Sequence, residues 1–168
     1  IVFNNNGPRV CTGTLLNNLA QDETPYFLTA NHCVDSQAIA QTVEAYWFYQ
    51  TTSCNSGVLR NWVHTGPGAN LLATQGSNDF SFMRLQNSAP GGAYFSGWSS
   101  TAQSAGTPVF GLHHPDGYVP PSVNSYLRRT TGGITDTNFN CLGLVNGYDV
   151  GWTSGSTEPG LHFRNSKV

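Results

Sequence analysis

His32 and Cys33 directly follow a segment, Tyr26-Phe27-Leu28-Thr29, whose composition is typical of a strand. A histidine that acts as a general base near neutral pH must be held in one orientation. A disulfide at the adjacent residue would fix the backbone from which the imidazole projects. Cys11 lies 22 residues upstream, at the head of another apolar stretch that ends at Leu16. A Cys11–Cys33 bridge would therefore link two strands next to the histidine.

Asp79 is the second residue whose type and position suit chemistry, because it opens the mostly apolar stretch Phe80–Leu85. A carboxylate carried inward at the mouth of a strand tolerates desolvation only when it is hydrogen-bonded or paired. The simplest interpretation of an Asn-Asp pair before a strand is a turn. The context of His32 favours a functional carboxylate instead.

Both segments resemble trypsin-like serine proteases, and most closely the bacterial lysyl endopeptidase branch. The run from Cys11-Thr12-Gly13-Thr14 to Thr29-Ala30-Asn31-His32-Cys33 is similar to their histidine loop, and 78–85 is similar to the strand with the triad aspartate. The resemblance implies that His32 is the general base and then the acid. Asp79, 47 residues later, would accept a hydrogen bond from one ring nitrogen, so that the other can take a proton from a serine.

The nucleophile is expected near Thr157-Glu158-Pro159-Gly160. In lysyl endopeptidases a similar run leads directly into Ser-Ser-Gly-Ser, which holds the nucleophilic serine and oxyanion donors. Here Gly160 is followed by Leu161, so the serine segment expected after Gly160 is missing. Ser154 and Ser156 are weaker candidates, because they precede this run and oxyanion donors must be placed relative to the nucleophile.

The composition favours an all-β fold. Charged residues make up 10% of the 168 residues and aromatic residues 12%, and the 19 glycines suit many strands and turns. Alternating residues from Thr42 to Tyr49 predict one such strand. The resemblance implies one protease domain over 1–168 with two antiparallel, six-stranded-type β-barrels and the active site in the cleft between them. The first barrel, 1–90, would hold His32 and Asp79, and 91–168 would form an incomplete second barrel.

The four cysteines lack Cys-x-x-Cys spacing, which favours two disulfides and an oxidising compartment over a zinc site. Cys54 would pair with Cys141 if every cysteine pairs internally, and otherwise each pairs outside the chain. The adjacent His113 and His114 point to opposite faces of a strand and do not readily share one metal ion. We therefore expect no metal and no cofactor.

The charge pattern gives little information about binding partners. The net charge of −2 comes from scattered residues and predicts neither nucleic acid nor an anionic membrane as partner, and the chain has no membrane-length apolar run. The resemblance implies a secreted, extracellular bacterial serine endopeptidase, a monomer that acts on proteins or peptides. The alternative is an inactive homologue that binds peptide or protein in the same cleft. Cleavage after lysine is typical of this branch, but no residue here matches the acidic pocket residue behind it.

Overall fold

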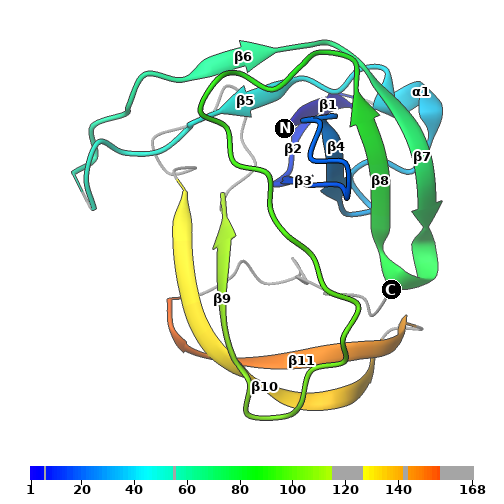
Figure 1. Ribbon diagram of the computed structural model, residues 1–168, viewed down its shortest axis with the longest axis vertical. Coiled ribbons are helices and arrows are strands. Elements are labelled where there is room, and N and C mark those ends of the chain that lie inside the picture. Colours follow the sequence, from blue (N-terminus) through cyan, green and yellow to red (C-terminus); the bar gives the residue numbers. More distant parts are fainter. Residues whose placement is uncertain (6, 55, 115–126, 142–143, 156–168) are drawn as a thin grey trace.

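The computed structural model describes residues 1–5, 7–54, 56–114, 127–141 and 144–155 (Figure 1). Strands dominate these segments. The helical elements among them are one short helix, α1 (Gln37–Ala40), and one 3₁₀ turn, η1 (Gly76–Asn78). The strands form antiparallel sheets, so the predicted all-β class is confirmed.

The largest sheet carries the residues that the sequence singles out. Its strands are β3 (Thr14–Leu16), β4 (Tyr26–Thr29), β8 (Phe80–Leu85) and β7 (Ala69–Gln75), in that order. β4 is antiparallel to β8, and Thr29 lies opposite Ser81. The end of β4 and the start of β8 therefore meet at one edge of the sheet, which brings the segment after Thr29 beside the segment before Phe80.

The apolar side chains of this sheet form the core because alternate residues of a strand share one face. Phe27 and Met83 lie opposite each other, with exposed fractions of 4% and 0%. Leu15 and Leu85 are buried in the same cluster. Gly13 is required next to it, since a Cβ there would lie 2.0 Å from Cε1 of Phe27. The glycine of the Cys-Thr-Gly-Thr motif thus lets the chain pass close to this ring.

Two small sheets add Phe3 and Ala45 to the core. β1 (Val2–Asn4) pairs with β2 (Pro8–Val10), and β5 (Ala45–Trp47) pairs with β6 (Val63–Thr65). The strand predicted from Thr42 to Tyr49 is therefore shorter than expected. Phe48 has φ of 59°, a left-handed conformation that an extended strand does not contain. This residue ends the strand although its aromatic side chain fits the alternating pattern.

The second half of the chain forms a separate three-stranded sheet in the order β11-β10-β9. Its strands are β9 (Pro108–His113), β10 (Arg128–Cys141) and β11 (Leu144–Ser154). Figure 1 shows this sheet below the others, with the crossover 86–107 leading to it from β8. Within the described ranges the strands make four sheets and no closed barrel, so the two barrels stay a prediction.

His114 connects this sheet to the first half of the chain. Its backbone N–H donates to Oγ1 of Thr12 at 3.0 Å, and its Nε2 lies 3.0 Å from the carbonyl oxygen of Tyr49. Burial lowers the pKa of His114 to about 4, because the charged ring is poorly solvated there. The ring is therefore neutral at pH 7 and donates from Nε2 to the carbonyl.

We expect this neutral histidine to make the fold sensitive to acid. The unfolded chain takes up the proton near pH 6.5 and the folded chain only near 4, so stability is complete above pH 6.5 and is lost as pH falls towards 4. The contribution is up to about 3 kcal/mol. In His114→Gln this component disappears. The unfolding free energy of the parent minus that of the variant, from urea titrations, should fall from pH 7 to pH 4, because only the parent loses this contribution in acid. A difference that does not change with pH would contradict the assignment.

Candidate active site

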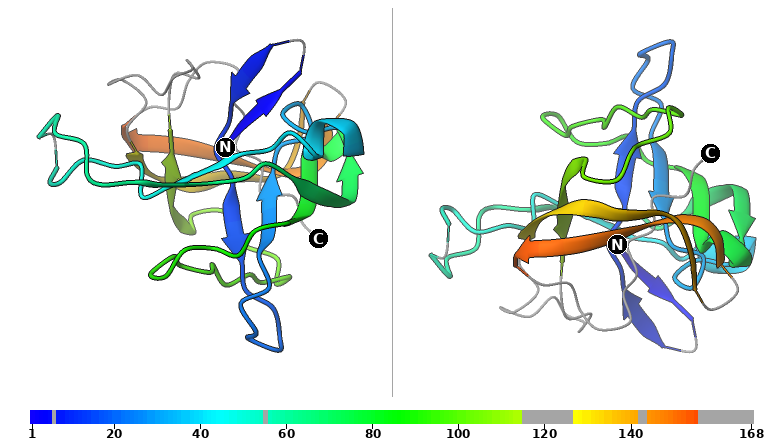
Figure 2. Two further views of the ribbon diagram at one scale, coloured as in Figure 1. Left: turned by 90° about the horizontal axis from the view of Figure 1, so that it is seen from above. Right: turned by 90° about the horizontal axis from the view of Figure 1, so that it is seen from below.

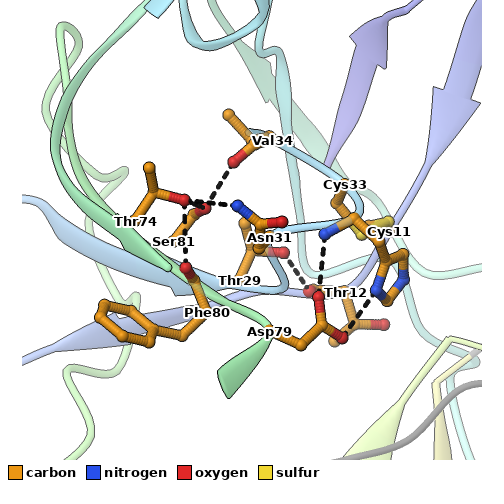
Figure 3. Close-up of polar contacts among 11 residues, drawn as sticks. Cys11, Thr12, Thr29, Asn31, Cys33, Val34, Thr74, Asp79, Phe80 and Ser81 are labelled. Atoms are coloured by element: carbon orange, nitrogen blue, oxygen red, sulfur yellow. Dashed lines mark hydrogen bonds and ion pairs between the residues drawn. A yellow bond between two sulfur atoms is a disulfide. The ribbon is translucent and has the colours of Figure 1, made fainter. Parts of the chain in front are cut away.

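The turn that carries His32 begins where β4 ends. The backbone N–H groups of Cys33 and Val34 both donate to the carbonyl of Ala30 at 3.2 Å, which closes the turn. Cys33 is 2% exposed and forms a disulfide with Cys11, so the predicted Cys11–Cys33 bridge is confirmed (Figure 3). The histidine therefore projects from a backbone that is fixed by hydrogen bonds and by a covalent link.

A side-chain hydrogen bond holds the residue directly before this turn. Oγ1 of Thr29, the last residue of β4, donates to the carbonyl oxygen of Thr12 at 2.9 Å. Thr12 follows Cys11, so this bond and the disulfide connect the same two segments. The segment before β3 is consequently held at two points, by the last residue of β4 and by the turn that follows β4.

Asp79 lies across from this turn, at the junction of η1 and β8. Its φ and ψ are 48° and 45°, a left-handed conformation that aspartate adopts more readily than most residues. Its backbone N–H donates to the carbonyl of Gly76 at 3.2 Å. The left-handed residue turns the chain from the 3₁₀ turn into the strand, and the carboxylate lies at the strand mouth as the sequence predicts.

Both carboxylate oxygens of Asp79 contact the same residue. Oδ2 lies 2.8 Å from Nδ1 of His32, and Oδ1 accepts a hydrogen bond from the backbone N–H of His32 at 2.9 Å. The side chain of Asp79 is 16% exposed and that of His32 is 47% exposed. Two contacts from one carboxylate fix both the position of the histidine backbone and the rotation of its ring.

This pair sets the protonation chemistry of the ring. The hydrogen bond that Nδ1 of His32 donates to Asp79 raises the pKa of His32 above 6.5, while partial burial opposes the rise and the charge of Asp79 adds to it. In the neutral ring the proton is kept on Nδ1, facing the carboxylate, and Nε2 carries the lone pair. A half-exposed imidazole in this tautomer can accept a proton from a nearby hydroxyl group.

The backbone contact is the part of the site that sequence reasoning missed. The sequence predicts only the bond between the ring and Asp79. Every residue except proline has an N–H group, so no residue type signals that the amide of His32 donates to Asp79. Only the pairing of β4 with β8 reveals it.

The cysteines beside His32 do not form a metal site. Ligand atoms of Cys11, His32 and Cys33 lie within 4.8 Å of one another. The two sulfurs are joined in a disulfide, whereas zinc binds thiolates. Of the other histidine pair, His113 ends β9 and is buried at 1% exposure, and the ring of His114 contacts the carbonyl of Tyr49.

One of the two weaker nucleophile candidates, Ser154, lies in the described part of the chain. Ser154 is the last residue of β11 and pairs with Thr131 of β10. β11 contacts η1 near its beginning, and its arrowhead points to the opposite side of the molecule (Figures 1 and 2). Ser154 therefore lies at the end of β11 away from η1, the turn that leads into Asp79 (Figure 1). Ser156 and the expected nucleophile position after Gly160 lie outside the described residues.

The predicted pairing of Cys54 with Cys141 can be checked at Cys54. Cys54 is exposed and its thiol is free in the structure. The side chain of Cys141 lies outside the described part of the chain, although its backbone ends β10. The alternative in which Cys54 and Cys141 pair internally is therefore not seen here.

Comparison with known proteins identifies the family. The family described as lysyl endopeptidase, C-terminal domain, matches residues 1–161. The lysyl endopeptidase of Pseudomonas aeruginosa is 38% identical over 161 residues, which cover 92% of this chain and 32% of that protein. The chain thus spans about a third of the length of this curated relative. The chain belongs to the lysyl endopeptidase C-terminal domain family.

Proposed function

We propose that this chain supplies the general base and the orienting acid of a serine endopeptidase that acts on proteins or peptides. The observation that carries the proposal is the double contact of the Asp79 carboxylate with the ring and the backbone of His32. Family membership favours peptide-bond hydrolysis as the reaction. Both groups would act within one protease domain over 1–168.

The proposed chemistry follows from the tautomer of His32. Nε2 takes the proton of a serine hydroxyl while the serine oxygen bonds to the substrate carbonyl carbon. The same nitrogen then gives the proton to the leaving amine, and water releases the acyl group by the reverse pattern. Asp79 remains ionised and stabilises the imidazolium. Because only the neutral ring is a base, activity should rise with pH through the raised pKa of His32.

Cellular location belongs to the same proposal. The Cys11–Cys33 disulfide favours an oxidising environment, and we propose that the protein is secreted by a bacterium and works as a monomer. None of the helices in the described segments has the length and apolar character needed to span a bilayer.

A fluorophosphonate probe tests for the complete triad. The 168-residue chain should not react, because Gly160 is followed by Leu161 in place of the serine segment. A variant with Ser-Ser-Gly-Ser inserted after Gly160 should be labelled at an inserted serine. In that background His32→Ala should slow labelling by at least about a hundredfold. Mass mapping of the adduct identifies the serine.

The other outcomes separate the alternatives. An insertion variant that is folded by circular dichroism but stays unlabelled would contradict the proposed triad. That result would favour the inactive homologue that binds peptide in the cleft, which the Gly160-Leu161 junction also favours. Labelling of Ser154 or Ser156 in the parent chain, lost in His32→Ala, would show that the base is correct and that the nucleophile is misassigned.

The role of Asp79 gives a second prediction. Asp79→Asn removes the charge and the carboxylate acceptor, so the pKa of His32 should fall towards 6.5 or below it. NMR titration of the histidine ring carbons measures this directly, and the ring nitrogen shifts report the tautomer. Asp22→Asn is the matched control, since Asp22 is bonded to Asn18 and Thr24 in a distant loop. Equal pKa values of His32 in the parent and in Asp79→Asn would rule out this role.

A further inference from the structure

A chain of side-chain hydrogen bonds lies beside the His32–Asp79 pair (Figure 3). Nδ2 of Asn31 donates to Oγ1 of Thr74 at 2.7 Å, and Oγ1 of Thr74 lies 2.6 Å from Oγ of Ser81. Oγ of Ser81 in turn donates to the carbonyl oxygen of Val34. Ser81 is fully buried, and Val34 is 0% exposed.

The direction of this chain follows from the number of hydrogens. A serine hydroxyl has one hydrogen, and that of Ser81 points to the carbonyl of Val34. The short contact between Thr74 and Ser81 must then use the hydrogen of Thr74, although the carbonyl of Phe80 also lies within 3.2 Å of it. Each hydroxyl therefore donates once and accepts once. The order is Asn31 to Thr74 to Ser81 to Val34.

The four residues enclose the two catalytic candidates along the chain. Asn31 and Val34 stand on either side of His32 and Cys33, whereas Thr74 and Ser81 stand on either side of η1 and Asp79. Thr74 and Ser81 are also directly opposite each other in the pairing of β7 with β8. The hydrogen bonds therefore join the segment of the base to the segment of the acid at both flanks.

We propose that Thr74, with Asn31 and Ser81, is a positioning residue that sets the distance between His32 and Asp79. The proposal deepens the proposed function and rests on it. The disulfide and the Ala30 carbonyl hold the His32 turn to its own side of the sheet, but neither reaches the segment of Asp79. The Asn31–Thr74 and Ser81–Val34 bonds do reach it. Hydrogen bonds weaken steeply as they lengthen or tilt, so a small shift of the turn weakens both contacts of Asp79.

Thr74→Val tests the proposal, because it removes the hydroxyl and keeps the shape of the side chain. Thr74 is exposed, so the substitution does not open a cavity in the core. The pKa of His32, measured by NMR titration of the 168-residue chain, should fall by about half a unit or more as the contact with Asp79 loosens. Thr74→Ser restores the hydroxyl and should return the pKa to the parent value.

Two further variants separate positioning from stability. Thr153→Val removes an exposed hydroxyl that donates to the carbonyl of Thr131 in the other sheet, and it should leave the pKa of His32 unchanged. Ser81→Ala leaves the Val34 carbonyl without its donor and should lower both the melting temperature and the pKa. A folded Thr74→Val chain with the parent pKa of His32 overturns the proposal, even if its melting temperature falls.

The two proposals fail separately. The pKa of His32 does not depend on a nucleophile, so it reports positioning even where fluorophosphonate labelling fails. In the variant with Ser-Ser-Gly-Ser after Gly160, Thr74→Val should slow labelling by about tenfold and Thr74→Ser should restore it. Labelling that requires His32 but is unaffected by Thr74→Val overturns the positioning role and leaves the proposed function intact.

Discussion

The antiparallel pairing of β4 with β8 is the constraint on which the site depends. It brings together residues 47 positions apart, because Thr29 and Ser81 lie opposite each other and the next residues outward lead to His32 and Asp79. The buried side chains of Phe27 and Met83 fix the register, since a slip of one residue would turn the apolar face outward. Core packing therefore determines the geometry of the polar pair.

The polar pair compensates for its own desolvation. A carboxylate that is 16% exposed loses most of its hydration, and the two donors of His32 replace it. Two restraints hold the turn that carries His32 to different parts of the structure. The Cys11–Cys33 bridge holds it to the segment before β3, and the hydroxyl chain through Thr74 holds it to β7 and β8. The ring of His32 is then held in place while about half of it remains exposed to solvent.

Polar contacts of His114 attach the second sheet to the same region. His114 donates its backbone N–H to Thr12, the residue after Cys11, and its neutral ring contacts Tyr49. The crossover segment adds backbone bonds along β3, where Ser96 donates to Leu15. A histidine that is neutral at pH 7 and becomes protonated in acid thus joins the two halves of the chain near His32.

The sequence alone determined the all-β class, because composition and alternation depend on residue type. It also predicted the Cys11–Cys33 bridge and the pair of His32 with Asp79, through motifs that resemble those of a known protease family. The tertiary structure decided the rest. Phe48 ends a strand that the pattern extends, and Ser154 lies at the far end of β11. Strand pairing brings the amide of His32 to Asp79 and the hydroxyl of Thr74 to Asn31. Such groups occur throughout any chain, so only their position in space decides what they bind.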